Sequence, residues 1–195
     1  MRREVHVDRD HERFTETHVP AEEAAGVVVL APHGGDVEPP TDEQALALRD
    51  RLGAGAGAWL CRGTVAEGNP FERWHVTSTE LSRASFEFLG DVLDRGYRRA
   101  VAFHGLAPDK ERVVVGGRAD RSLRERLREE LDARVPAPVV VSELGPYAGV
   151  DPDNVVNHAA RLGGLQVEQP AAVRHGHADA VVDAVVATLD GADRG

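Results

Sequence analysis

The chain is poor in cysteine and in long apolar runs, and each shortage excludes a class of protein. Cys61 is the single cysteine, so no intramolecular disulfide can form and thiolates alone cannot build a metal site. A metal would need histidine and carboxylate ligands. No apolar run approaches the roughly 18 residues of a membrane span, and the charged N-terminus lacks the apolar core of a signal peptide. We therefore expect a cytoplasmic protein without a membrane partner.

Positive charge is also scarce. The sequence has 33 acidic against 23 basic residues, a formal net charge of −10, and Lys110 is its single lysine. The arginines of residues 121–130 alternate with glutamates at helical spacing, which is typical of an ion-paired solvent face. Nucleic-acid binding needs clustered cations, so we expect no nucleic-acid partner. An acid-rich, lysine-poor composition is also typical of halophilic organisms, where salt screens the surface charge.

Length and hydrophobicity predict one domain with its own core. The chain has 195 residues, of which 42% are hydrophobic. Residues 1–24 are polar and show no apolar period, so we expect a peripheral arm or an irregular lead-in. Residues 25–195 are expected to form the single domain.

From residue 26 onward, short apolar runs alternate with amphipathic stretches, as in an α/β sheet covered on both faces. The runs that predict strands are 26–30, 58–61, 100–103, 112–115, 138–141 and 165–167. The stretches that predict helices are 41–52, 81–92, 123–131, 151–162 and 178–189. The expected fold is a three-layer α/β/α domain with a mostly parallel mixed sheet. Its functional residues should lie in loops at the carboxyl ends of the strands.

Two strand ends carry histidines that could bind a metal. His33 follows the first strong strand, and Gly34 and Gly35 allow a tight turn that brings Glu38 back toward it. His104 ends another buried strand and is followed by glycine. Two histidines and one glutamate would hold zinc and leave a fourth position open for water. The alternative is a polar loop in which these histidines only bind backbone groups.

Two further residues are candidates for chemistry or substrate contact. Glu168 lies at the end of the alternating run 165–167, where a carboxylate beside a metal site could act as a general base. It could equally be a helix cap or a surface acid. His75 lies in a segment with an aromatic residue and three hydroxyls, and is either a substrate contact or an ordinary loop histidine.

Several short motifs in the same order resemble those of the poly-γ-glutamate hydrolase family, first known from bacteriophages and related to zinc carboxypeptidases. They are Ala31-Pro-His-Gly-Gly-Asp-Val-Glu38, Trp74-His-Val-Thr-Ser-Thr79, Phe103-His-Gly105, Val115-Gly-Gly117, Asn157 and Gly164-Leu-Gln-Val-Glu168 with Arg174. The resemblance covers residues 26–190. It implies a zinc-carboxypeptidase-like fold, a zinc ion held by His33, Glu38 and His104, and Glu168 as the catalytic carboxylate.

The resemblance also implies a γ-glutamyl substrate, small or oligomeric, whose carboxylates need cationic anchors. Arginine suits this role because its planar fork binds a carboxylate through two hydrogen bonds. The expected substrate-binding residues are Arg174, His75, Arg118 and Asn157. We expect a zinc-dependent hydrolase that cleaves γ-glutamyl amide bonds. The alternatives are an N-acyl amino-acid deacylase of the same fold and a non-catalytic anion-binding α/β domain.

Overall fold

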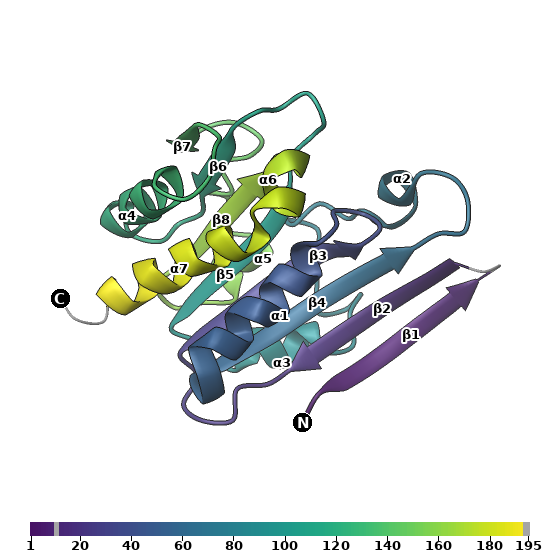
Figure 1. Ribbon diagram of the computed structural model, residues 1–195. Coiled ribbons are helices and arrows are strands. Elements are labelled where there is room, and N and C mark those ends of the chain that lie inside the picture. Colours follow the sequence, from purple (N-terminus) through teal and green to yellow (C-terminus); the bar gives the residue numbers. More distant parts are fainter. Residues whose placement is uncertain (10–11, 193–195) are drawn as a thin grey trace.

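The computed structural model describes residues 1–9 and 12–192, and its centre is one sheet of eight strands (Figure 1). The strands are β1 (Arg3–Arg9), β2 (Glu12–Val19), β3 (Val27–Gly35), β4 (Ala56–Thr64), β5 (Arg99–Gly105), β6 (Val113–Gly116), β7 (Val139–Val141) and β8 (Gly164–Gln169). Their spatial order is β1-β2-β4-β3-β5-β8-β6-β7. The strands β4, β3, β5 and β8 run parallel, while β1, β2 and β6 add antiparallel pairings. The mostly parallel mixed sheet and all six predicted strands are confirmed.

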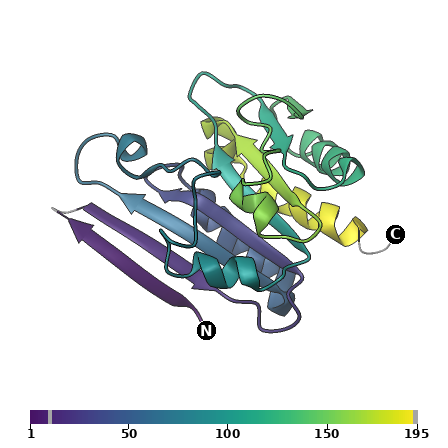
Figure 2. The same cartoon turned by 180° about the vertical axis from the view of Figure 1, so that it is seen from behind.

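Helices cover both faces of this sheet, which confirms the three layers (Figures 1 and 2). The helices are α1 (Thr41–Leu52), α2 (Pro70–Trp74), α3 (Leu89–Asp94), α4 (Arg121–Asp132), α5 (Val155–His158), α6 (Ala171–Gly176) and α7 (Ala178–Ala192). Helices α1, α4 and α7 bury their apolar sides in one core, and α3 and α5 pack in a second core on the opposite face. Within β3, Val29 faces the first core and Val28 the second, because successive strand residues point to opposite faces.

The predicted helices at 41–52, 123–131 and 178–189 are confirmed by α1, α4 and α7, but two predictions were too long. The stretch 81–92 is helical only from Leu89, because the amides of Glu87 and Phe88 donate to the carboxylate of Glu16 on β2 instead of continuing a helix. The apolar positions of 81–92 reflect burial in the second core. The stretch 151–162 is helical only over α5, whose N-cap is Asn154.

The expectation that residues 1–24 form an irregular arm was wrong. Strand β2 pairs antiparallel with β4, and β1 pairs with β2, so the segment extends the sheet; residues 10–11 lie outside the described chain. Its polar residues misled the prediction because Thr15, Glu16, Thr17 and His18 are all buried. Buried polar groups are tolerated where hydrogen bonds satisfy them, and Glu16 accepts three.

None of the helices within the described residues is both long and apolar enough to cross a bilayer.

Candidate metal centre and active-site pocket

The last residues of β3 and the loop that follows carry two of the predicted metal ligands, His33 and Glu38, and are held tightly in place. The Glu38 amide donates to the His33 carbonyl at 2.8 Å, which folds the loop back onto the strand end. A side chain at Gly34 would meet Asp42 of α1 at 2.5 Å, and Gly35 has a φ of +69°, so both positions require glycine. Asp42 accepts a hydrogen bond from the Gly35 amide at 3.1 Å and forms an ion pair with Arg62 on β4. Both contacts anchor the loop to the sheet.

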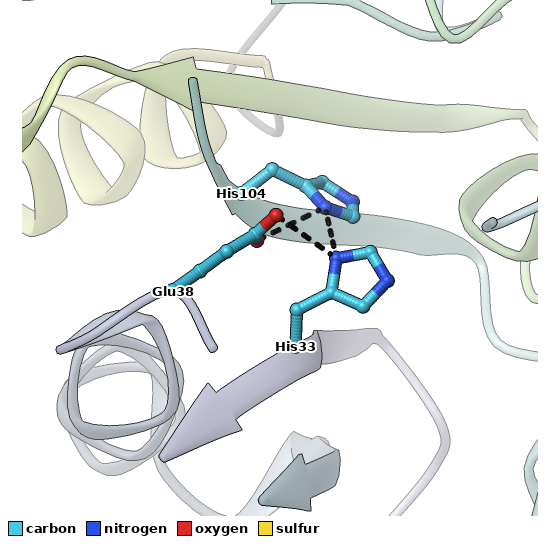
Figure 3. A group of neighbouring side chains, drawn as sticks. All are labelled: His33, Glu38 and His104. Atoms are coloured by element: carbon cyan, nitrogen blue, oxygen red, sulfur yellow. Dashed lines mark hydrogen bonds and ion pairs between the residues drawn. The ribbon is translucent and has the colours of Figure 1, made fainter. Parts of the chain in front are cut away.

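His33, Glu38 and His104 converge at the carboxyl ends of β3 and β5 (Figure 3). His33 Nδ1 lies 3.2 Å from Glu38 Oε1 and 3.3 Å from His104 Nδ1, and His104 Nδ1 lies 3.6 Å from Glu38 Oε2. All three residues are at most 5% exposed. The predicted meeting of the two strand-end histidines with Glu38 is therefore present.

The geometry of this group fits a metal ion. Two ligands bound at about 2.0–2.1 Å in a tetrahedron lie roughly 3.3–3.4 Å apart, close to the separation of the two histidine Nδ1 atoms and to the distance from each to one of the two Glu38 oxygens. His33 Nε2 donates to the Val76 carbonyl at 2.8 Å, which leaves the lone pair on Nδ1 free to face the group. Three protein ligands on one side leave a fourth position open, as catalytic rather than structural zinc sites do.

The charges in the group are complementary to a cation. Burial alone would raise the pKa of the Glu38 carboxyl, but His33 and His104 hold that pKa well below its usual range. Burial lowers the pKa of His104, whereas for His33 the effect of burial is outweighed by Glu38, which raises the pKa of that imidazole. Both imidazoles have to be neutral to bind a metal ion, so binding would release the proton that Glu38 favours on His33. An ionised carboxylate with neutral imidazole is the donor set that a divalent transition metal prefers.

Glu168 lies beside this group on the neighbouring strand. In the sheet its Cα is the partner of His104, and its side chain is 7% exposed. Burial and the negative charge of Glu38 raise the pKa of Glu168 well above its usual value. A carboxyl that exchanges its proton more readily near neutral pH is suited to general acid–base work.

A pocket of about 850 Å³ opens above these residues. It is lined by all three members of the His33 group, by Glu168, and by Arg174 and His75. The His75 ring lies between the His33 ring at 4.1 Å and the Phe71 ring at 4.0 Å, so it forms part of the wall.

Arg174 extends from α6 into the lining of the pocket, and its guanidinium packs against Gly105. Its Nε donates to the Gln169 carbonyl at 3.3 Å, and its Nη1 donates to the Pro39 carbonyl. A side chain at Gly105 would meet the Arg174 guanidinium at 2.8 Å, so glycine at this position leaves the guanidinium its place. Arg174 is placed at the same pocket as Glu168 and is tied to the chain directly after Glu38.

Arg118 and Asn157 lie elsewhere. Both line a separate hollow of about 420 Å³ and neither lines the larger pocket. The side-chain oxygen Oδ1 of Asn157 accepts a hydrogen bond from the backbone amide of Arg118 at 2.9 Å. The Asn157 Nδ2 donates to the backbone carbonyls of Gly149 and Asp151, both at 2.7 Å. These contacts give Asn157 a structural role, and the geometry does not support the predicted contact of either residue with a substrate in the larger pocket.

Two pocket residues, Asn154 and Gln166, escaped the sequence reasoning. Gln166 Nε2 donates to Glu168 Oε1 at 2.9 Å, and Asn154 Nδ2 donates to Gln166 Oε1 at 3.0 Å. The one signal for Asn154 was its place just before the apolar pair Val155-Val156, as expected of a helix N-cap. Gln166 alternates with Leu165 and Val167 and looks like an ordinary strand residue.

Comparisons with known proteins agree with this geometry. Residues 6–181 match the family model of the poly-gamma-glutamate hydrolases. The UPF0714 protein YndL of Bacillus subtilis (strain 168) is 30% identical over 158 residues, which are 80% of this chain and 58% of YndL. The prophage-derived UPF0714 protein YoqZ of the same strain is 28% identical over 142 residues, 73% of this chain and 48% of YoqZ. The chain thus spans about half the length of these curated relatives.

Two solved structures share the fold. A bacteriophage poly-gamma-glutamate hydrolase superposes with a TM-score of 0.74 at 21% identity, covering 91% of this chain and 89% of that one. A zinc-free apo form of YndL superposes with a TM-score of 0.69 at 25% identity, covering 91% of this chain and 90% of the other. Both likenesses extend over nearly the whole sheet and its helices.

Proposed function

The chain belongs to the poly-gamma-glutamate hydrolase family, and on that premise we propose that it is a zinc-dependent hydrolase of γ-glutamyl amide bonds. One observation carries the proposal: the ligand atoms of three buried residues converge beside a second buried carboxylate, that of Glu168, in one pocket. A structural metal site would have four protein ligands and no adjoining cavity.

His33, Glu38 and His104 would hold the zinc ion through Nδ1, a carboxylate oxygen and Nδ1. The likeness to a protein solved in a form named zinc-free supports zinc as the metal. Zinc bound there would supply Lewis-acid activation of water and of the scissile carbonyl. The residues fit that role because their donor atoms lie close together and two of them are held by the backbone, His33 by the Val76 carbonyl and Glu38 by the Gly105 amide at 2.9 Å.

The remaining residues divide the work of proton transfer and binding. Glu168 would accept a proton from the attacking water and donate it to the departing amine, because it is buried beside the ligands and its pKa is raised. Arg174 would bind the carboxylate of the substrate with the part of its guanidinium that faces the pocket. His75 and Phe71 would form the wall against which the substrate lies.

The charges of the pocket favour a short substrate over a long polymer. Of the described residues that line it, Arg174 is the one arginine or lysine, whereas Glu38, Asp151 and Glu168 are acidic. Poly-γ-glutamate carries a carboxylate on every residue, so a bound polymer would place several unpaired negative charges in or near this pocket. We propose a γ-glutamyl compound with one carboxylate next to the scissile amide.

A second candidate is an N-acyl amino-acid deacylase, and the apolar part of the pocket lining favours it. The pocket that Arg174 lines is also lined by five apolar or aromatic residues, Phe71, Leu106, Pro108, Tyr147 and Val150. That surface would accept an acyl chain while the arginine binds the amino-acid carboxylate.

Metal analysis combined with a substrate panel tests the proposal. Purified protein should contain about one zinc per chain, and His33→Ala should lose it. The panel compares a γ-glutamyl dipeptide, long poly-γ-glutamate and N-acyl amino acids at equal concentration. Glu168→Gln should keep the zinc and lose roughly 100-fold or more in kcat, while Glu67→Gln, at an exposed position, should change neither.

Each outcome separates the hypotheses. Preference for the dipeptide supports the proposal, and preference for N-acyl amino acids moves the assignment to the deacylase. Preference for the polymer contradicts the short-substrate part. A protein without metal or turnover would be a non-catalytic anion-binding domain.

A further inference from the structure

Asn154, Gln166 and Glu168 are linked in a buried hydrogen-bond chain at the pocket floor. We infer that Asn154 and Gln166 are positioning residues that fix which oxygen of Glu168 exchanges its proton with the substrate. The inference rests on the proposed function, since it assigns the proton carrier of that reaction. The three side chains are 5%, 3% and 7% exposed.

The direction of this chain is set at its outer end by a backbone donor. The Val156 amide in the first turn of α5 donates to Asn154 Oδ1 at 3.1 Å. An amide N–H can only donate, so Asn154 has to present its oxygen there and its Nδ2 toward Gln166. Asn154 Nδ2 then donates to Gln166 Oε1 at 3.0 Å, and Gln166 Nε2 donates to Glu168 Oε1 at 2.9 Å. A single backbone amide therefore determines the orientation of both side-chain amides.

Gly149 packs closely against the side chain of Gln166. A side chain at Gly149 would lie 2.6 Å from Gln166 Oε1, so only glycine allows this approach. Gly149 has a φ of +59° and its carbonyl accepts from Asn157 Nδ2. The segment that carries Gly149 therefore lies against the Gln166 amide.

One oxygen of Glu168 is consequently committed as an acceptor. Oε1 receives the Gln166 hydrogen bond in both protonation states, so the proton resides on Oε2. During hydrolysis, Oε2 takes a proton from the water as its oxygen bonds to the carbonyl carbon. It gives that proton to the amine nitrogen as the C–N bond breaks, and the carboxylate is regenerated.

Asn154→Asp tests the direction of the chain by a nearly isosteric change. Aspartate still accepts from the Val156 amide and is a good N-cap, so α5 should be retained. It offers no donor to Gln166, which would turn its Nε2 toward the introduced carboxylate and its oxygen toward Glu168. Glu168 would then donate from Oε1, and its proton would point away from the pocket.

We expect Asn154→Asp to lower kcat by at least about tenfold, with KM and zinc content within about twofold of the wild type. Gln166→Met should have a similar effect, and the double variant should be no worse than either single one, because both break the same chain. Asp153→Asn exchanges the same two groups one residue earlier at an exposed position and should change neither parameter. Undiminished kcat in Asn154→Asp would overturn the inference.

A second readout does not depend on turnover. The sequence has three asparagines and three glutamines, so six pairs of side-chain NH₂ signals are expected in a ¹H–¹⁵N NMR spectrum. The Gln166 signal should shift in Glu168→Gln and again in Asn154→Asp, while that of exposed Asn69 should not. A Gln166 signal indifferent to both changes would contradict the chain. If the wild type hydrolysed none of the substrates, the proposed function would be wrong. The NMR measurement would still show whether the hydrogen bonds between Asn154, Gln166 and Glu168 exist.

Discussion

At the scale of single residues, Arg174 joins the two halves of the proposed site. It donates to the carbonyls of Pro39 and Gln169, which follow Glu38 and Glu168 directly in the sequence. Burial lowers the pKa of Arg174, while the same two carboxylates raise it. One guanidinium thus fixes the positions of the metal loop and of the end of β8 and also faces the pocket.

We predict that Arg174→Lys raises KM at least about tenfold for a substrate with a carboxylate and lowers kcat less. A lysine offers a point charge in place of the planar fork that binds a carboxylate through two hydrogen bonds. The check is steady-state kinetics with the acid and with the same compound carrying a neutral amide there. The wild type and Arg174→Lys should have similar KM values for the neutral amide. Arg121→Lys, at an exposed position, should match the wild type on both compounds. An equal loss on both compounds would assign Arg174 a purely structural role.

His18 shows how a buried histidine outside the site can make stability depend on pH. It is buried on β2, with its Nδ1 2.5 Å from the Arg3 guanidinium and its ring 6.4 Å from that of Phe88. Burial first, and then the charge of Arg3, lowers the pKa of His18 from 6.5 to about 4, against a smaller opposing effect of Asp91. Arg95 acts in the same direction as Arg3.

We predict that His18 destabilises the fold in acid. As pH falls, His18 is protonated in the unfolded chain near pH 6.5, whereas in the folded chain it stays neutral down to about pH 4. The free energy of unfolding therefore has its full value above pH 6.5 and decreases as pH falls toward 4. Between those values the loss is about 2–3 kcal/mol. Urea unfolding of chelator-treated protein should show a shallower pH dependence for His18→Gln than for the wild type. His158→Gln, at an exposed position, should leave the slope unchanged, and an unchanged slope in His18→Gln would contradict the prediction.

His33 and His104 could be predicted from the sequence because each stands near a strand end and is followed by glycine, and Glu38 because Gly34 and Gly35 allow a turn back toward His33. Parallel strands bring such ends to one edge, so His33 and His104 were expected to meet, and the structure places them 3.3 Å apart. Arg118 and Asn157 could not be judged in this way, because which hollow a loop residue lines depends on how the loops pack. The role of Gln166 could not be predicted from the sequence either, because it depends on a hydrogen bond from Asn154, which lies on another element.

At the scale of elements, Glu16 connects the N-terminal hairpin to the second core. Its Oε1 accepts from Trp59 Nε1 at 2.7 Å and from the Phe88 amide at 2.9 Å, and its Oε2 accepts from the Glu87 amide at 2.7 Å. One carboxylate therefore links β2, β4 and the segment that leads into α3. Its burial is tolerable because three donors replace its water.

We predict that Glu16→Gln lowers the free energy of unfolding by about 2 kcal/mol. The amide of glutamine has one acceptor oxygen, so its NH₂ group has to face one of the three donors that the carboxylate satisfies. Urea unfolding followed by Trp fluorescence measures the change. Glu23→Gln, at an exposed position, is the matched control and should unfold like the wild type. Equal stability of the two variants would show that Glu16 does not hold these elements together.

The hairpin and the shortened helix at 81–92 were missed for one physical reason. Apolar periodicity detects elements that bury hydrophobic faces, whereas β2 buries Thr15, Glu16, Thr17 and His18. Glu16 also withdraws the amides of Glu87 and Phe88 from helix formation. The central strands and α1, α4 and α7 were predictable because their valines, leucines and alanines carry the core themselves.

At the scale of the whole molecule, the three predicted metal ligands lie at the carboxyl ends of two central strands, beyond the two hydrophobic cores. The first core joins α1, α4 and α7 to one face of the sheet, and the second joins α3 and α5 to the other. Both cores are built from hydrophobic side chains, which need no ion to pack. Folding should therefore not require the ion, unlike in small zinc domains whose core is too small to form without it.

We predict that chelation lowers the melting temperature without unfolding the protein. A ligand present at about 1,000 times its Kd stabilises the native state by about 4 kcal/mol, and for a chain of this size each kcal/mol shifts Tm by roughly 2–4 °C. Calorimetry with and without EDTA should show a loss of about 10 °C that zinc restores, while far-UV circular dichroism at 25 °C stays the same. His33→Ala should melt at the lower temperature and ignore EDTA, because it has lost a ligand. Collapse of the circular dichroism signal on chelation would show instead that the cores depend on the ion, and an EDTA-insensitive wild type would remove the metal from the proposed mechanism.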